Sequence, residues 1–150
     1  MHYKTEIIIN KPRQEIIDVF ENPSLLPLWQ RGLKRSRLLS GKNGEEGSKR
    51  KLYITIEGQS IKMTETIIKK NLPEEWHGEY SSKGIESVQK NYFEDINENQ
   101  TKWTSYSEFK FSGFMKVISK LLPEIFKKRS VLVQKDFKAF IEDGKSVKTN

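Results

Sequence analysis

The chain has 150 residues, 35% of them hydrophobic and 31% charged, with 9 glycines and 5 prolines, so one globular domain fits better than two domains or a disordered segment. The absence of cysteine excludes a disulfide framework, a thiolate metal site and a cysteine nucleophile. The net charge of +7 favours loose contact with nucleic acid or anionic lipid head groups. The basic residues are dispersed, however, so we interpret them as a solvated face and expect no nucleic-acid partner.

The composition also limits the compartment and the cofactors that we expect. Residues 1–6 carry charge where a signal peptide has an apolar run, and no stretch approaches the roughly 18 apolar residues of a membrane span. We therefore expect a cytoplasmic protein without stable membrane insertion, either a monomer or a homodimer. Only His2 and His77 are histidines, and glycine-rich phosphate-binding signatures are missing. We expect no metal and no cofactor.

The first third of the chain predicts one strand followed by two short helices. A β-rich run at 3–9 ends at Asn10-Lys11-Pro12, where Asn can cap a helix and Pro fits its first turn. Apolar residues then recur at helical spacing up to Phe20. Asn22-Pro23 ends that helix and can begin a second short helix that reaches Trp29.

The rest of the chain predicts six strands and one long helix. The strands are expected at 33–39, 49–56, 61–70, 75–81, 85–95 and 101–111, and their short turns require antiparallel pairing. The helical period runs from Gly113 to about Glu142, with a kink or break near 119–123 because Pro123 cannot donate a backbone hydrogen bond. We expect a single domain over 1–144 and a disordered tail over 145–150.

These elements predict an α+β fold in which a strongly curved, seven-stranded antiparallel sheet is covered by the long C-terminal helix. Five segments suggest a family resemblance: Asn22-Pro23-Ser24 with Trp29, residues 63–67, Thr101-Lys102-Trp103 with Phe109, residues 111–116, and residues 137–140 with Glu142. Together they resemble the helix-grip fold of the START/SRPBCC (pollen-allergen-like) superfamily, in particular its polyketide cyclase/dehydrase-like bacterial members. The resemblance implies a cavity between sheet and helix that holds a lipid, a sterol, a polyketide or another apolar molecule.

Candidate ligand-binding residues follow from strand alternation and from the helical stripe. The strand at 101–111 places large aromatic residues and two serines on one face, which would leave volume for a ligand. The alternative is that the same side chains fill the core solidly. The candidates are Trp29, Met63, Glu65, Trp76, Tyr80, Trp103, Ser105, Ser107, Phe109, Phe111, Phe114, Ile118 and Leu122.

Glu65 is the one candidate for catalysis. It shares a strand face with Met63 and Ile67, so its carboxylate is expected to point inward, where desolvation raises its pKa. The alternatives are that this face bends toward solvent, or that Glu65 pairs with a nearby Lys or Arg. Two functions remain open: a carrier or sensor of a small hydrophobic molecule, and a cyclase or dehydratase in which Glu65, Tyr80 or Tyr92 moves a proton.

Overall fold

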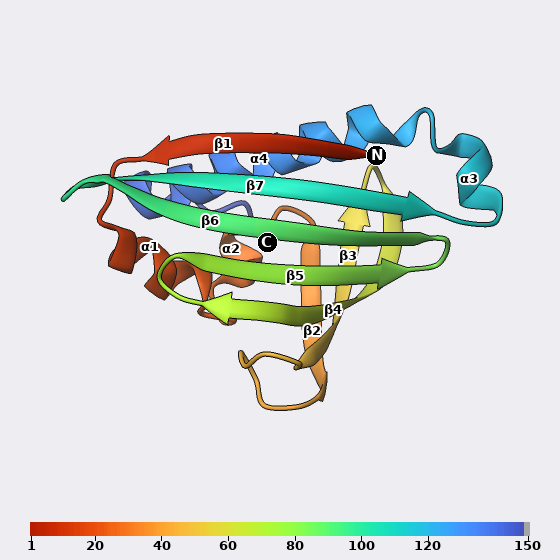
Figure 1. The fold of residues 1–150 in the computed structure, drawn as a ribbon, viewed down its shortest axis with the longest axis horizontal. Helices are drawn as coiled ribbons and strands as arrows, with labels where there is room; N and C mark the ends of the chain where they lie inside the picture. Colours follow the sequence, from red (N-terminus) through yellow and green to blue (C-terminus); the bar gives the residue numbers. More distant parts are fainter. Residues whose placement is uncertain (149–150) are drawn as a thin grey trace.

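The computed structural model describes residues 1–148 and contains one seven-stranded antiparallel sheet (Figure 1). The strand order across the sheet is β1-β7-β6-β5-β4-β3-β2. The strands are β1 (His2–Ile9), β2 (Leu33–Ser40), β3 (Lys49–Ile56), β4 (Gln59–Asn71), β5 (Glu75–Ser82), β6 (Ile85–Asn97) and β7 (Gln100–Phe111), and the helices are α1 (Arg13–Phe20), α2 (Leu26–Trp29), α3 (Phe114–Ile118) and α4 (Leu122–Asp143). The α+β, helix-grip architecture expected from the sequence is confirmed.

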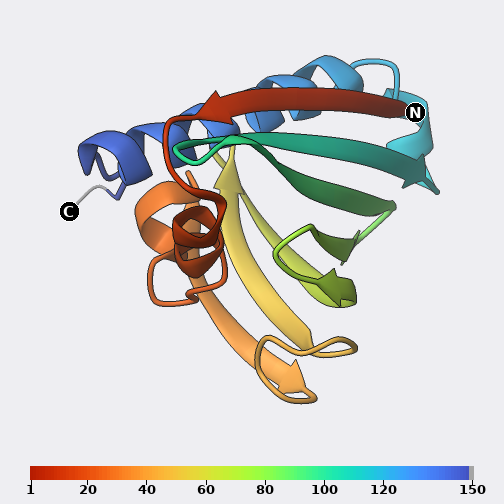
Figure 2. The same ribbon diagram turned by 60° about the vertical axis from the view of Figure 1, so that its left-hand side comes forward.

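The sheet is strongly curved. Strands β2 and β3 run across the direction of β6 and β7 (Figure 1), and the turned view shows the helices on the inner side of the bend (Figure 2). The pairing register shifts at four places, including Ile67/Lys69 in β4 and Leu33/Arg35 in β2. An extra residue in one strand of a pair bends that strand and increases its twist. These irregularities therefore help the sheet to close around α4.

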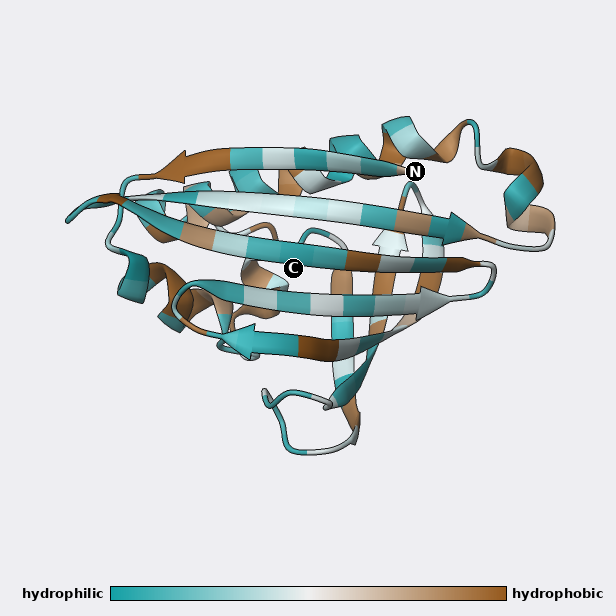
Figure 3. Ribbon diagram, viewed as in Figure 1, coloured by the Kyte–Doolittle hydropathy of each residue, from teal (hydrophilic) through white to brown (hydrophobic). Residues whose placement is uncertain are grey.

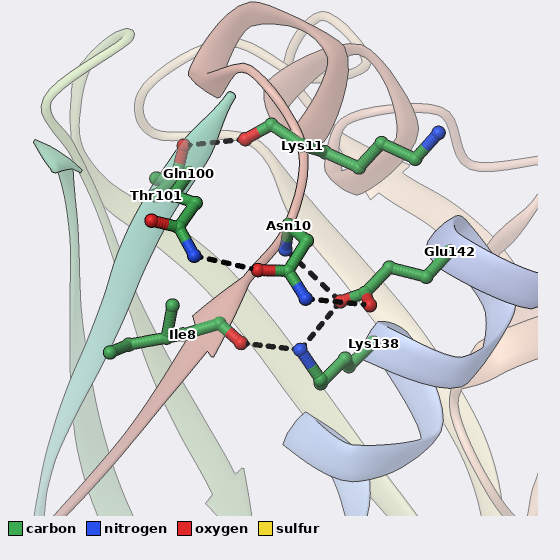
Figure 4. Close-up of polar contacts among 7 residues, drawn as sticks. All are labelled: Ile8, Asn10, Lys11, Gln100, Thr101, Lys138 and Glu142. Atoms are coloured by element: carbon green, nitrogen blue, oxygen red, sulfur yellow. Dashed lines mark hydrogen bonds and ion pairs between the residues drawn. The ribbon is translucent and has the colours of Figure 1, made fainter. Parts of the chain in front are cut away.

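The link between β1 and α1 fastens the N-terminal strand to the C-terminal helix (Figure 4). Asn10 does not cap α1, whose N-cap is Pro12 without a side-chain bond. Its side-chain amide instead donates to Glu142 of α4 (3.2 Å) and accepts from Gln100 (2.9 Å). Lys138 completes this connection by donating to the carbonyl of Ile8 (2.7 Å). The expected cap is thus replaced by a contact between the two ends of the chain.

The C-terminal helical region breaks where Pro123 predicted a kink or break. Helix α3 ends at Ile118, and α4 begins at Leu122, so Pro123 lies in the first turn of α4. Proline is tolerated there because the first N–H groups of a helix have no intrahelical acceptor. Gly144 ends α4 in a left-handed conformation (φ 69°). Residues 145–148 form no helix or strand. Within them, Val147 N–H donates to the carbonyl of Leu28 (2.8 Å). Residues 149–150 of the expected tail lie outside the described part of the chain.

The solid core occupies the end of the molecule where α1 and α2 meet the sheet. Phe20 lies within 6.3 Å, centroid to centroid, of five aromatic rings, those of Trp29, Trp76, Phe93, Trp103 and Phe137. A smaller apolar cluster of Leu33, Leu52 and Ile54 lies under β2 and β3. Within residues 1–148 no helix is both long enough and apolar enough to cross a membrane. The aromatic cluster therefore packs α1, α2 and α4 against one end of the sheet.

Candidate functional site

A cavity of about 400 Å³ lies between the concave face of the sheet and α4. Strands β1 and β3 to β7 contribute to its lining, together with residues of α1, α2 and α4 and the loop between β2 and β3. Its apolar lining includes Phe20, Leu26, Leu52, Ile54, Ile61, Met63, Ile85, Phe109, Phe126 and Val133. A pocket of this size and character is typical of sites for small organic molecules.

Nine of the predicted ligand-binding residues line this cavity: Trp29, Met63, Glu65, Trp76, Tyr80, Trp103, Ser105, Ser107 and Phe109. The alternation predicted for the strand at 101–111 places Trp103, Ser105, Ser107 and Phe109 together on the inner face, as expected. Trp29 and Trp103 are only 1% and 3% exposed, so their rings form the closed end of the cavity and not its open side.

The other four predicted residues, Phe111, Phe114, Ile118 and Leu122, do not line the cavity. The sequence predicts one apolar helical stripe that continues through the break before α4. In the structure, the turn at Gly113 (φ 60°) directs α3 past the end of the sheet. Phe114 is consequently 76% exposed. Phe111 is on the expected side of β7 but lies beyond the cavity, where its ring stacks on Phe126 (6.4 Å).

Three polar side chains, Arg50, Glu65 and Tyr80, lie side by side across the cavity floor, and we call them the polar row. Arg50 of β3 is the register partner of Glu65 of β4, and Glu65 is the register partner of Tyr80 of β5. All three line the cavity. Neighbouring strands are about 4.8 Å apart, so side chains that are directly opposite can interact. The inward direction expected for Glu65 agrees with this geometry. Arg50 is its register partner, but the described residues form no ion pair between the two side chains.

The electrostatics of the polar row raise the pKa of both Glu65 and Tyr80. Burial raises the pKa of the Glu65 carboxyl, although its hydrogen bond with Tyr80 and the charge of Arg50 lower it in part. Burial, followed by the Glu65 charge, raises the pKa of the Tyr80 hydroxyl well above its ordinary value. Glu65 retains intermediate exposure because it borders the cavity. The polar row therefore combines a carboxylate that is more basic than a free one with a phenol that is less acidic than a free one.

Arg50 was not predicted as a site residue. It precedes Leu52 by two residues, so strand alternation places both on one face, but its charge suggested an exposed side chain. Its Nη1 donates to Asn43 Oδ1 (2.7 Å) and its Nη2 to Ser36 Oγ (2.9 Å). Its Nε is buried and has no hydrogen-bond acceptor within residues 1–148. A buried donor without an acceptor is costly, so this N–H is available to a bound molecule.

A second polar group lies where β1 and β7 face α4. Thr5 and Ser105 are register partners, 6% and 1% exposed, and both hydroxyls are buried without a partner within the described residues. Tyr3 bonds to Ser130 Oγ of α4 (2.7 Å), and its hydroxyl also donates to the carbonyl of Phe126 (3.0 Å). Both orphaned hydroxyls border the cavity, so they are available to water or to a ligand oxygen.

Arg129 of α4 is a further cavity-lining residue that the sequence did not single out. Its Nη2 donates to the carbonyl of Arg31 (2.8 Å), and burial lowers the pKa of its guanidinium. Arg31 itself pairs with Asp136 through two bonds of 2.9 Å. Helical periodicity identifies only the apolar residues of α4, so it gives no signal for a charged lining residue such as Arg129.

The mouth of the cavity lies between the end of α1 and the loop that joins β2 to β3. Glu21, Pro23 and Asn43 are exposed and also line the cavity. Lys70 of β4 forms an ion pair with Glu21 and donates to the carbonyl of Gly44 (2.8 Å). Lys70 therefore bridges the two sides of the mouth.

Neither a metal site nor a histidine-based site emerges from the described residues. Among residues 1–148 there is no group of three or more His, Asp or Glu side chains placed to hold a metal ion. His77 does not border the cavity, and its Nε2 lies 3.1 Å from Glu75 Oε2.

Several solved structures have a fold similar to that of this chain. Neither the protein-family models nor the curated proteins contain a match. Among solved structures, the Zhui aromatase/cyclase of Streptomyces sp. R1128 has a TM-score of 0.81 at 9% identity, over 95% of this chain and 93% of its own. A conserved protein from Geobacillus kaustophilus has a TM-score of 0.78 at 15% identity, over 94% and 95%.

A third similar structure is a point mutant of norcoclaurine synthase from Thalictrum flavum, in complex with a transition state analogue. Its TM-score is 0.72 at 10% identity, over 96% of this chain and 95% of its own. At identities this low the likeness concerns the fold and not the activity. The seven-stranded curved sheet, the helices inside its bend and these likenesses together show that the chain has the helix-grip fold of the START/SRPBCC proteins.

Proposed function

We propose that the protein binds a small, mostly apolar molecule in the cavity between the sheet and α4. The observation that carries the proposal is the cavity itself: about 400 Å³, bordered largely by apolar side chains, with its mouth between Glu21 and Asn43. The predicted alternative was a core filled solidly by its own side chains, and this volume argues against it. Transfer of an apolar ligand from water into such a space is favourable in proportion to the area buried.

Several chemical classes fit the proposal: a lipid, a sterol or a polyketide-like compound. The floor of the cavity carries Arg50, Glu65 and Tyr80, while its walls carry Leu52, Met63 and other apolar residues. A compact molecule with an apolar body and a few oxygens would satisfy both surfaces. Similar folds include an aromatase/cyclase and a norcoclaurine synthase, which supports a small organic molecule over a macromolecular partner.

The direct test is native mass spectrometry of the purified protein, combined with thermal unfolding in the presence of fatty acids, sterols and polyphenols. We expect a co-purified small molecule or a rise in the melting temperature, because a ligand that binds only the folded state stabilises it. The matched variants are Met63→Trp, which fills the cavity, and Ile68→Trp on the same strand, where Ile68 is 42% exposed. Binding should be lost only in Met63→Trp, and equal binding by the two variants would contradict the proposal.

A second candidate function is proton-transfer catalysis of the cyclase or dehydratase kind, supported by the position of Glu65 directly opposite Tyr80 in the lining of the cavity. Ionised Glu65 would remove the proton adjacent to a ligand carbonyl, and Tyr80 would donate its proton to the departing hydroxyl, which leaves as water. The test is to incubate the protein with β-hydroxyketones and to follow the loss of water by mass spectrometry. Glu65→Gln should abolish turnover while binding persists; turnover that survives in this variant would refute the role of Glu65.

We also propose that residues 1–144 act as one domain, in the cytoplasm, as a monomer or a homodimer. The pairing of β1 with β7 and the contact of Asn10 with Glu142 join the two ends of this range. Limited proteolysis should leave residues 1–144 intact, and sedimentation should give the mass of one or two chains. Early cleavage between β2 and β3 that separates two stable fragments would contradict a single domain.

A further inference from the structure

The polar row also bears on what kind of molecule the cavity selects. Arg50, Glu65 and Tyr80 come from three consecutive strands and are joined by register. Two of the three nitrogens of the Arg50 guanidinium are occupied by Asn43 and Ser36. The third, Nε, is buried and unpaired within the described residues and borders the cavity. An acceptor atom on the ligand is the natural partner for this N–H.

At the polar row, an ionised Glu65 disfavours an anionic group on the ligand. A carboxylate placed against Arg50 would also face Glu65, the direct register partner of Arg50. Two carboxylates at one site cannot both ionise without cost. A carbonyl or hydroxyl oxygen avoids this conflict, because it can accept from Arg50 and Tyr80 and, when it carries a hydrogen, donate to Glu65. The polar row therefore matches a neutral oxygen-bearing group.

An aromatic surface lies next to the polar row. Gly78 separates Trp76 from Tyr80 on the inner face of β5, and a Cβ atom added there would lie 3.0 Å from both the Trp76 ring and the Tyr80 hydroxyl. Only glycine leaves this space free, so the Trp76 ring and the Tyr80 hydroxyl come together at the floor of the cavity. A flat ligand can place its ring against Trp76 and its oxygen at the polar row.

We infer that, given the ligand binding proposed above, the cavity selects a neutral cyclic compound whose hydroxyl or carbonyl oxygen is held by Arg50, Glu65 and Tyr80. Three probes of nearly equal size test this inference: naphthalene, 2-naphthol and 2-naphthoate, with dissociation constants measured from the quenching of tryptophan fluorescence. We expect 2-naphthol to bind about tenfold more tightly than naphthalene, the scale of one or two hydrogen bonds. The carboxylate should bind more weakly than the naphthol.

Variants connect this preference to the polar row. Tyr80→Phe and Glu65→Gln should each reduce several-fold the ratio of the naphthalene to the 2-naphthol dissociation constant. The matched controls are Tyr106→Phe and Glu79→Gln, because both residues are exposed. If naphthalene and 2-naphthol bind equally, the inference is wrong while the proposed function stands. If none of the three probes binds, both are wrong, and tighter binding of the naphthoate would overturn the choice of a neutral ligand.

A separate observation concerns the end of the molecule beyond the cavity. Phe114, Val117 and Leu121 are 76%, 75% and 72% exposed, and we call them the apolar patch. Their spacing places them on one side of α3 and of the turn that follows it, and Figure 3 shows this region as a hydrophobic projection at the edge of the molecule. Exposed large apolar groups that lie together mark an interaction surface.

The chain segment that carries the apolar patch is basic. Between residues 110 and 128 the chain has five exposed lysines and one exposed glutamate: Lys110, Lys116, Lys120, Lys127, Lys128 and Glu124. The segment is also anchored beside the cavity, because Ser112 N–H donates to Gly84 O (2.9 Å) and Met115 packs on Gly84. Ile85, the next residue, lines the cavity. Exposed apolar side chains on a segment with a surplus of exposed lysines are complementary to an anionic lipid surface.

We propose that the apolar patch docks on the surface of an anionic bilayer. Co-sedimentation with phosphatidylcholine vesicles, with and without phosphatidylglycerol, tests this. We expect binding only to the anionic vesicles, weakened by salt and reduced at least about tenfold in the triple variant Phe114→Ser, Val117→Ser, Leu121→Ser. The control is Leu38→Ser with Leu39→Ser, which changes exposed residues of β2. Absent binding, equal binding by both variants, or a dimer that only the triple variant abolishes would overturn the proposal.

Discussion

Replacing one buried and one exposed phenylalanine by alanine tests the placement of the C-terminal helices. Phe137 of α4 is fully buried (0% exposed) and lies 4.8 Å from Trp29, 5.3 Å from Trp103 and 6.3 Å from Phe20 between ring centroids. Phe114 of α3 is 76% exposed. The same substitution therefore compares a fully buried with a largely exposed phenylalanine of the C-terminal helical region.

The two changes should differ by several kcal/mol. A buried phenylalanine removes roughly 200 Å² from water, which corresponds to about 5 kcal/mol at about 25 cal/mol per Å². Measured costs of Phe→Ala in cores are about 3–5 kcal/mol. We expect Phe137→Ala to lower the free energy of unfolding by about 4 kcal/mol, or roughly 8–16 °C in melting temperature. Phe114→Ala should change it by less than about 0.5 kcal/mol.

Urea unfolding followed by tryptophan fluorescence measures both free energies, because Trp29 and Trp103 lie against Phe137. Equal m-values in the two variants would show that the denatured states are comparable. A loss of more than about 2 kcal/mol in Phe114→Ala would refute the reasoning. It would mean that α3 packs on the body of the protein as a continuous helix would, and that Phe114 lines the cavity after all.

Three further predictions concern the site and the closure of the fold. Because burial raises the pKa of Glu65 in the folded state, the native protein loses stability as pH rises from the unfolded pKa through the folded one. Glu65→Gln removes that loss, which is about 1.4 kcal/mol per pKa unit. The variant should therefore be more stable than the native protein at pH 7 but not at pH 3. Equal dependence of the melting temperature on pH in the two proteins, measured by calorimetry, would argue against a desolvated carboxyl. Lys70→Met removes the bridge across the mouth and should accelerate 2-naphthol association in stopped-flow fluorescence. Lys62→Met changes an exposed residue of the same strand and is the control. An association rate that is unchanged in Lys70→Met would place the mouth elsewhere. Asn10→Ala loses the bonds to Glu142 and Gln100 and should cost about 1–2 kcal/mol in urea unfolding, whereas an unchanged midpoint would show that the N-terminal strand is held by the sheet alone.

Most of the fold could be predicted because its signals are local. Alternation along 101–111 identified the inner face of β7, since side chains in a strand point to opposite sides with a period of two. Tight turns between consecutive runs required antiparallel pairing. Pro123 located the break before α4 because its missing N–H acts within one turn of helix.

The candidate site was only partly predictable. Alternation correctly turned Glu65 toward the interior beside Met63. The same rule applies to Arg50, but a charged side chain is normally exposed, so its inward position depends on Asn43, Ser36 and Glu65, which lie on other segments. Phe114 carried the periodicity of a lining residue, yet the direction of α3 after Gly113 depends on its packing at Gly84.

The sequence by itself determined the identity and order of the strands and helices and the face that each strand turns inward, because these properties depend on residues a few positions apart. Only the tertiary structure decided which side chains meet across strands, where the aromatic core stops and how much space remains beneath α4. These depend on register, sheet curvature and the direction of chain breaks, which bring together residues as distant as Tyr3 and Ser130.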